Sequence, residues 1–436
     1  MKYKSCKHIE GSLYIAPNEV RSCCQRFFYK DKMRGDAELI KINEHDDLPG
    51  YDEIKNARLK LFEDIQENKS EQCMGCPQLY ETSVKPKFNG EINHLSVEHH
   101  SVCNLRCTYC SEIYYGGKRS KYNVTEFVKK LSNENSLKNC KQVVWGGGEP
   151  TLDKTFEEIV KGIQNSANPK IYHRVFTNSV RYHDAIFKFL ESGLIKIVTS
   201  IDSGTPETFK KVRGREKFYD VFSNLKKYSS AGSNRITIKY IFTEENMNFR
   251  ELDKFVENCV KYKLTECCYQ ISMNYKNDKL SLDFLKSVIY LMGLFKKNNI
   301  KKFFGDDHIM SRFKTLKINE KKDLDSFLKE HELQDIILNN ILKNEKLNFF
   351  GINLIVENIL NKTINQTQLN QITLIDSDKN KQGKTLKGKQ IMDPKILLNS
   401  SDKIFIAPPQ SYDDIHDQLL NKLKIKKNRI VHGVFI

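Results

Sequence analysis

The chain of 436 residues is too long for one ordinary domain, and its apolar fraction of 39% is sufficient for two or three hydrophobic cores. It contains no run of about 18 apolar residues and no apolar amino-terminal segment of signal-peptide length, so we expect a cytoplasmic protein without a membrane span. The net charge of +16 suits an anionic partner, but lysine is spread along the whole chain, which favours solvated helix faces over a nucleic-acid-binding surface.

The first 87 residues are set apart by their cysteines. Five of the twelve cysteines of the chain lie there, with one clear helical pattern that begins at Tyr51. The cytoplasm keeps thiols reduced, so clustered cysteines in such a protein indicate metal or cluster ligands rather than disulfides. The stretch VKPKFNG then separates this part from the next. We predict a small cysteine-rich domain over residues 1–87.

Residues 88–300 show strands alternating with amphipathic helices. Short runs rich in β-branched residues recur in the order INHLSV, QVVW, IYHRVFT, IKIVTSI, RITIKYIF and CYQISM. Between them lie helical patterns such as residues 156–163 and 249–262. This alternation implies parallel strands joined by right-handed crossovers. We therefore predict an α/β fold, a TIM-barrel-like partial (β/α)6 barrel with its chemistry in the loops after the strands.

Three cysteines follow the first of these strands in the stretch CNLRCTYC. They are Cys103, Cys107 and Cys110. Three thiolates can hold three irons of a [4Fe–4S] cluster and leave the fourth iron open for a substrate or cofactor. Zinc on the same thiols is the alternative, but zinc prefers paired C-x2-C knuckles. The spacing therefore predicts a catalytic [4Fe–4S] cluster.

The same stretch carries a family resemblance. CNLRCTYC resembles the CxxxCxxC signature of the radical S-adenosylmethionine (radical SAM) superfamily, and Tyr109 stands before the last cysteine as that pattern prefers. In this family the amino and carboxylate groups of SAM chelate the open iron. VVWGGGEP, after the second strand, resembles the glycine-rich motif of the family. That resemblance implies that Gly147, Gly148 and Glu149 meet the methionine amino group, with glycine allowing close backbone approach.

A third motif, IVTSIDSGTPETFKKVRG, resembles the fourth-strand segment of the same family. It implies that Ser200 and Asp202 bind the ribose or the methionine part of SAM and that Arg213 pairs with the SAM carboxylate. The resemblance covers residues 92–275. It implies an enzyme that cleaves SAM to a 5′-deoxyadenosyl radical and removes a hydrogen atom from its substrate. A protein such as flavodoxin or ferredoxin would donate the electron.

The amino-terminal cysteines are similar to those of the SPASM iron–sulfur domain that accompanies many radical SAM enzymes. The resemblance implies one auxiliary [4Fe–4S] cluster held by four thiols, those of Cys6, Cys23, Cys73 and Cys76. Cys24 is the alternative to Cys23, and a structural zinc ion on the same thiols is the alternative to the cluster. Thr82 stands where the next cysteine of that family would fall, so we expect no second auxiliary cluster.

The last part of the chain is predicted to be a helical connector, residues 301–345, and a small doubly wound domain, residues 346–436. It resembles the Rossmann-like module fused to sugar-modifying methyltransferases and surface-polysaccharide enzymes. Asp376 and Asp378 end its second strand, where nucleotide folds place a ribose-binding acid. Only Gly351 remains of the phosphate loop, so nucleotide binding and substrate docking both stay open.

The substrate is the least determined part of this prediction. The carboxyl-terminal module favours a nucleotide-linked or surface-polysaccharide sugar, whereas the SPASM-like domain favours a peptide to be matured. From another class, the chain could be a zinc-stabilised nucleic-acid-binding protein without catalysis. No stacking platform or added RNA-binding motif supports a nucleic-acid partner. We predict a radical SAM enzyme that acts on a sugar.

Overall fold

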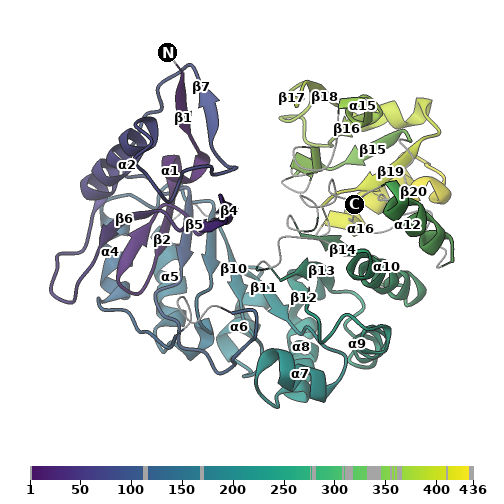
Figure 1. Cartoon of the computed structure of the whole chain (residues 1–436), viewed down its shortest axis with the longest axis horizontal. Helices are drawn as coiled ribbons and strands as arrows, with labels where there is room; N and C mark the ends of the chain where they lie inside the picture. Colours follow the sequence, from purple (N-terminus) through teal and green to yellow (C-terminus); the bar gives the residue numbers. More distant parts are fainter. Residues whose placement is uncertain are drawn as a thin grey trace. The chain divides into compact units, whose positions relative to one another are not determined.

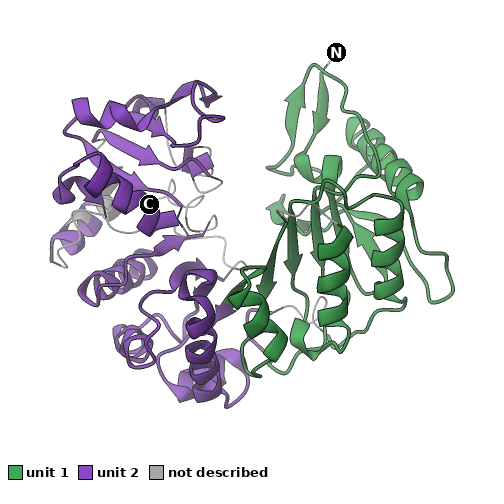
Figure 2. Cartoon of the chain, turned by 180° about the vertical axis from the view of Figure 1, so that it is seen from behind, with its two compact units in different colours: residues 1–106, 110–198 green, residues 107–109, 199–436 purple. Residues whose placement is uncertain are grey.

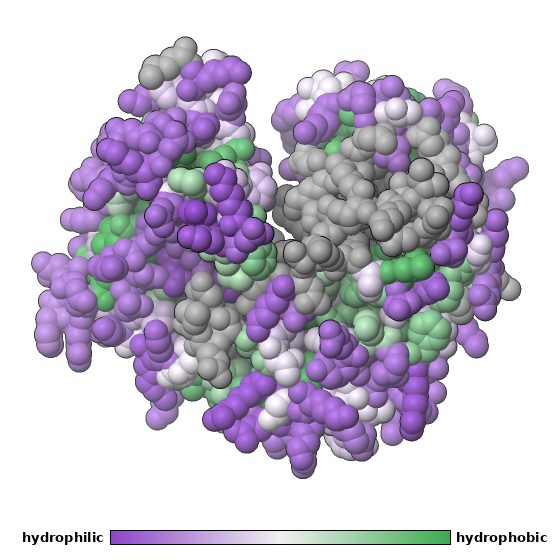
Figure 3. Space-filling view, in the orientation of Figure 1, coloured by the Kyte–Doolittle hydropathy of each residue, from purple (hydrophilic) through white to green (hydrophobic). Residues whose placement is uncertain are grey.

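The computed structural model divides the chain into two compact units (Figure 2). Unit 1 comprises residues 1–106 and 110–198, and unit 2 comprises residues 107–109 and 199–436. None of the described helices is long and apolar enough to cross a membrane. The face shown in Figure 3 is mainly hydrophilic, with apolar residues in small groups. The structure describes residues 2–110, 116–166, 171–274, 276, 281–306, 309, 318–330, 345–353, 356–357, 359–360, 366–408 and 411–431.

The main sheet of unit 1 is built around parallel strands (Figure 1). Four strands are parallel neighbours, in the order β10 (Tyr172–Phe176), β9 (Gln142–Trp145), β8 (His94–Val97) and β2 (Ser12–Ile15). At one end, β10 pairs in parallel with the first part of β11 (Ile195–Ser200). At the other end, two antiparallel strands extend the sheet, β3 (Glu19–Arg21) and β6 (Glu38–Lys41).

The helices of unit 1 pack an apolar face inward. In α5 (Phe156–Ser166), Phe156, Ile159, Val160 and Ile163 are all buried, as the period of the pattern predicts. The Asn123 side chain caps the neighbouring helix by accepting a hydrogen bond from the Glu126 N–H. The other helices are α1 (Lys7–Gly11), α2 (Tyr51–Gln66), α4 (Val124–Asn133) and α6 (Asp184–Glu191). Two small antiparallel pairs complete the unit, β1 (Tyr3–Ser5) with β7 (Tyr80–Thr82) and β4 (Arg26–Tyr29) with β5 (Lys32–Gly35).

The sheet continues into the amino-terminal cysteine-rich part. β2 pairs in parallel with β8 from Ser12 opposite His94 to Ile15 opposite Val97. The residues between Gly11 and Ala16 are all buried. A strand of the first 87 residues therefore stabilises the edge of the sheet that carries the cysteine loop.

Unit 2 continues the alternation of strands and helices. Its parallel strands are β12 (Ile236–Phe242), β13 (Cys268–Met273) and β14 (Phe303–Gly305). Its first helix is α7 (Pro206–Arg213). The Thr205 hydroxyl caps this helix, Pro206 occupies its first position, and Gly214 ends it with φ +75°. The helices are α7 (Pro206–Arg213), α8 (Phe218–Gly232), α9 (Phe249–Lys261), α10 (Leu282–Lys297) and α12 (Ile318–Glu330).

The six strands predicted for residues 88–300 are all present, as β8 to β13, with helices between them. This confirms the predicted α/β class and the strand–helix succession of a partial (β/α)6 barrel. β14 is a further parallel strand that the sequence did not indicate. Of the predicted helical connector, residues 307–308, 310–317 and 331–344 lie outside the described residues.

The carboxyl-terminal domain is a doubly wound sheet. Five strands are parallel: β15 (Leu347–Phe350), β16 (Ile372–Ile375), β18 (Lys389–Met392), β19 (Lys403–Ile406) and β20 (Ile430–Val431). In the sheet their order is β18-β16-β15-β19-β20, with β17 (Thr385–Leu386) antiparallel at the edge. Numbered along the chain this is the order 3-2-1-4-5. It confirms the predicted doubly wound class, although the sequence did not indicate β18.

Helices and apolar side chains enclose this smaller sheet. Phe350, Ile375, Ile404 and Leu419 belong to one buried cluster. The pattern NLIVENIL predicts a helix over residues 353–360, of which 354, 355 and 358 lie outside the described residues. The described helices are α15 (Gln366–Asn370), α16 (Tyr412–Asp417), the π-helical turn Gln418–Lys422, and the 3-10 turns Pro394–Asn399 and Lys427–Arg429.

Candidate active site

The three cysteines of CNLRCTYC lie in the loop that follows β8. Cys103 is exposed, and Cys107 and Cys110 are half-buried. The Cys103 sulfur accepts hydrogen bonds from the Leu105 N–H at 3.5 Å and from the Asn178 side-chain amide at 3.7 Å. Donors to a sulfur favour its thiolate form and tune a cluster bound to it. Three cysteines at this spacing, one of them with hydrogen-bond donors to its sulfur, fit the ligand set of an open [4Fe–4S] cluster.

The glycine-rich turn after β9 packs directly on the base of this loop. A Cβ at Gly147 would lie 2.5 Å from the His100 carbonyl oxygen, and a Cβ at Gly148 would lie 2.1 Å from the Val102 carbonyl oxygen. Gly147 also has φ +83°, which favours glycine. The Gly148 N–H donates to the His100 carbonyl at 2.9 Å. Both glycines are therefore required by close packing against the protein's own backbone, whereas the sequence suggested only approach to a cofactor.

Glu149 fastens this turn to the end of the third barrel strand. The side chain is 2% exposed. One carboxylate oxygen accepts from the Thr151 and Thr177 hydroxyls at 2.7 and 2.8 Å, and the other accepts from the Asn178 N–H at 2.6 Å. Burial raises the pKa of Glu149, although these hydrogen bonds oppose the shift.

A chain of contacts therefore runs from Glu149 through Asn178 to Cys103. The Asn178 amide also donates to the Asn104 side-chain oxygen at 2.6 Å. The signal for this arrangement in the sequence was the polar pair that ends the strand run IYHRVFTNS, since strand ends of a parallel sheet share one edge. Glu149 and Asn178 thus connect the glycine-rich turn with the cysteine loop.

In unit 2, a second network gathers at the end of β11. Asp202 is fully buried and has φ +61°, a strained conformation for this residue. One carboxylate oxygen accepts from the Tyr109 hydroxyl at 2.6 Å and from the Arg213 guanidinium at 2.7 Å, and the other accepts from the Ile241 N–H at 2.7 Å. The Asn246 amide donates to the Asp202 carbonyl at 2.8 Å. Ser200, at the end of the same strand, is half-buried.

Arg213 has a donor to spare in this network. It is 4% exposed, and its Nε is buried without a hydrogen-bond partner among the described residues. Burial works to lower the pKa of the guanidinium, but Cys107 and the other acidic neighbours raise it well above its ordinary value. An orphaned donor on a permanent cation fits the carboxylate of an amino-acid ligand such as SAM.

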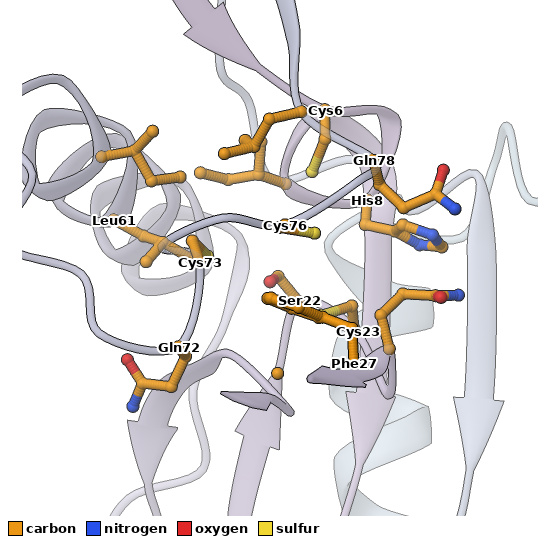
Figure 4. Close-up of a pocket in the computed structure, with 15 residues that line it drawn as sticks. Cys6, His8, Ser22, Cys23, Phe27, Leu61, Gln72, Cys73, Cys76 and Gln78 are labelled. Carbon is orange, nitrogen blue, oxygen red and sulfur yellow. The ribbon is translucent and has the colours of Figure 1, made fainter. Parts of the chain in front are cut away.

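The four amino-terminal cysteines line a common pocket (Figure 4). Cys6 precedes α1, Cys23 follows β3, and Cys73 and Cys76 lie in the turn after α2. The Cys76 N–H donates to the Cys73 carbonyl at 3.1 Å, which closes the CxxC turn. Burial raises the pKa of Cys6 to about 12 and of Cys73 to about 11, and neighbouring thiols add to both shifts. Four free thiols around one pocket are a ligand set that suits either an iron–sulfur cluster or zinc.

Cys24 has a different environment from its neighbour Cys23. It does not belong to the residues that line this pocket. Burial raises its pKa to about 12, and the nearby Glu98 carboxylate adds to the shift. Its hydrogen-bond partner is Tyr14. The sequence leaves open whether Cys23 or Cys24 is the fourth ligand. In the structure Cys23 lines the pocket and Cys24 does not.

Residues 97–256 match the family model of the Radical SAM superfamily. The chain carries a radical SAM domain. This domain contains the three loop cysteines, the glycine-rich turn, and the Asp202 and Arg213 network, so the prediction of a radical SAM domain is confirmed. A second family model, C2185-like, N-terminal, matches residues 343–431.

Curated relatives match part of the chain. GTP 3′,8-cyclase of Yersinia pestis is 28% identical over 173 residues, which are 39% of this chain and 52% of that protein. GTP 3′,8-cyclase of Actinobacillus succinogenes is 30% identical over 158 residues, 36% of this chain and 46% of that protein. The chain thus spans about half the length of the curated relatives it matches. A solved structure of Streptococcus suis SuiB bound to precursor peptide SuiA is 14% identical, with a TM-score of 0.42, covering 62% of this chain and 68% of that one.

Proposed function

We propose that this protein is a radical SAM enzyme. The observation that carries the proposal is the CxxxCxxC spacing of Cys103, Cys107 and Cys110 within a segment that matches the superfamily. Bound there, a [4Fe–4S] cluster and SAM supply a 5′-deoxyadenosyl radical, which removes a hydrogen atom from the substrate. The three cysteines hold the cluster, and Asn178 orients Cys103.

Other residues of the chain bind and position SAM in this proposal. The free Arg213 Nε donates to the SAM carboxylate, and Asp202 keeps the guanidinium in place. Gly147 and Gly148 present backbone groups to the methionine end, while Ser200 and Tyr109 border the same ligand. A donor such as flavodoxin or ferredoxin supplies the electron. Anaerobically reconstituted protein should release 5′-deoxyadenosine when given dithionite and SAM, and a colourless zinc protein that cleaves no SAM would contradict the proposal.

The amino-terminal pocket would hold an auxiliary [4Fe–4S] cluster on Cys6, Cys23, Cys73 and Cys76. Support comes from the position of these four cysteines around one pocket (Figure 4). Soft thiolates are the ligands that iron–sulfur clusters use. The same set also favours a peptide-maturing enzyme as the second candidate function, because it resembles the SPASM arrangement.

Adjacent cysteines offer a matched test of this site. We expect wild-type protein to bind about eight irons per chain and Cys23→Ala to bind fewer, because one iron of the amino-terminal cluster loses its protein ligand. Cys24→Ala should keep the full count, since its thiol lies with Tyr14 and Glu98. Iron and zinc are measured by mass spectrometry after reconstitution. Stoichiometric zinc and about four irons in the wild type would instead identify a structural zinc site.

The substrate we propose is a nucleotide-linked or surface-polysaccharide sugar. Support comes from the doubly wound domain, whose parallel strands end at a common edge where such folds bind nucleotides. Gly351 has φ +85° after β15, and a Cβ there would lie 2.5 Å from the Pro408 ring. Asp376 is 6% exposed and already accepts from the Ile352 N–H at 2.8 Å and the Lys381 ammonium at 3.0 Å. Asp378 is exposed and is therefore the better ribose ligand.

Titration of the full chain with UDP-glucose and GDP-mannose tests this assignment. We expect one of them to bind and Asp378→Asn to weaken the Kd about tenfold or more, because a hydrogen bond to a charged group is lost. Asp376→Asn should lower the melting temperature, since it loosens the loops after β15 and β16. Asp402→Asn is the control, because Asp402 precedes β19 and therefore lies at the amino end of the strands, away from the proposed nucleotide site. If neither compound binds, the sugar substrate is rejected and the peptide candidate takes its place.

A further inference from the structure

A separate cavity in unit 1 lies beside the loops that follow β8 and β9. It has a volume of about 240 Å³. His99, His100 and Asp153 are among its lining residues, and no cysteine is. Both histidines come directly after the first barrel strand and its Glu98, and Asp153 follows the glycine-rich turn. None of these three side chains has a part in the chemistry proposed above.

Three donor groups converge at this cavity. The possible ligand atoms of His99, His100 and Asp153 all lie within 4.8 Å of one another. The His99 Nε2 is 2.6 Å from an Asp153 carboxylate oxygen. The two imidazole rings meet edge to face with their centroids 4.8 Å apart. A single ion could therefore contact all three groups after small side-chain rotations.

The histidines are buried but not satisfied. His99 is 8% exposed and His100 is 6% exposed. The Nδ1 atoms of both rings are buried and have no hydrogen-bond partner among the described residues. Buried polar atoms normally have a partner, so two unpartnered imidazole nitrogens on residues that line one cavity favour a ligand bound there.

Asp153 is held in place for this role by the start of the following helix. Its second carboxylate oxygen accepts from the Thr155 N–H and the Thr155 hydroxyl, each at 2.9 Å. Metal-ligating carboxylates are typically hydrogen-bonded in this way, which fixes the oxygen that faces the ion. The chain thus orients one carboxylate toward two neighbouring imidazoles.

We propose that His99, His100 and Asp153 bind one divalent first-row transition-metal ion. Two imidazoles and one carboxylate are the ligands of zinc and non-haem iron(II) sites, whereas calcium and magnesium prefer oxygen donors alone. Three protein ligands leave coordination positions free, and the adjacent cavity has room for water or an oxygen-containing ligand there.

Zinc binding to the reconstituted holoprotein tests the site, because iron already occupies the cysteines. After removal of loose metal, each protein is dialysed against zinc, and iron and zinc are counted by mass spectrometry. Wild type should take up about one zinc per chain beyond its iron. The double variant His99→Gln/His100→Gln should lose that zinc at an unchanged iron count. His45→Gln, an exposed histidine of the same unit, should behave as wild type.

Two further variants separate zinc binding at this site from effects on folding and from the cysteine cluster. Asp153→Asn can still accept the hydrogen bonds of Thr155 through its side-chain oxygen, so we expect an unchanged melting temperature with zinc affinity reduced tenfold or more. A chain with Cys103, Cys107 and Cys110 changed to alanine should still bind the histidine-dependent zinc, which separates this site from the proposed activity. Equal zinc uptake by wild type and by the double-histidine variant would overturn the proposal.

Discussion

Replacing Cys103, Cys107 and Cys110 with alanine is expected to abolish the release of 5′-deoxyadenosine from SAM and to remove about four irons per chain. Alanine offers no ligand to iron, and no other cysteine lies in the same loop. Cys103 is exposed and the other two are half-buried, so the truncation removes little packing. The fold should therefore persist, with far-UV circular dichroism and melting temperature close to those of the wild type.

The matched control for this experiment is Cys140→Ala. Cys140 is a buried thiol of unit 1 that donates to the Gln142 carbonyl at 3.5 Å and belongs to neither cysteine site. Its loss should leave the release of 5′-deoxyadenosine at the wild-type level. Anaerobic reconstitution, reduction with dithionite and chromatographic detection of 5′-deoxyadenosine give the measurement. Undiminished release by the triple variant would show that these cysteines do not hold the catalytic cluster.

The strands of the radical SAM domain could be predicted because their signal is local. Runs such as QVVW and ITIKYIF are apolar, β-branched and bounded by polar residues, and β9 and β12 lie there. The pairing of β2 with β8 carries no such signal, since it joins residues that are far apart in the chain. β17 and β18 were missed because KTLKGKQIM is rich in lysine and short of apolar residues.

The candidate site divides in the same way. Cys103, Cys107 and Cys110 could be recognised because all three lie within one loop, so their spacing can be read directly from the sequence. The histidine pair gave no signal, because adjacent histidines lack a recognisable ligand spacing and Asp153 lies on another loop. The role of Gly147 was only half visible. The sequence indicated that some group approaches the backbone closely there, but not that this group is the His100 carbonyl.

The buried pair of Asp202 and Arg213 leads to the second large prediction. The two side chains are 0% and 5% exposed and their charged atoms lie 2.7 Å apart. Arg213→Gln should lower the free energy of unfolding by about 3–5 kcal/mol, because it leaves a carboxylate buried without its counter-charge. Urea unfolding followed by circular dichroism measures this as a lower midpoint at an unchanged slope.

A control variant on the same helix separates the effect of losing a buried ion pair from the effect of removing one positive charge. Lys210 of α7 pairs with Glu216, but both side chains are more than half exposed. Lys210→Gln removes one positive charge, as Arg213→Gln does, and should change the free energy of unfolding by less than about 1 kcal/mol. Equal effects of the two variants would mean that Asp202 finds water or other donors once Arg213 is gone.

The double variant Asp202→Asn/Arg213→Gln separates stability from cofactor binding. With both charges removed no buried ion is left unpaired, so much of the lost stability should return. SAM binding should not return, because the Nε donor of Arg213 that we assign to the SAM carboxylate is still absent. Equilibrium dialysis with SAM after reconstitution measures this second quantity. A double variant that recovers both stability and SAM affinity would show that Arg213 only neutralises Asp202 and has no contact with SAM.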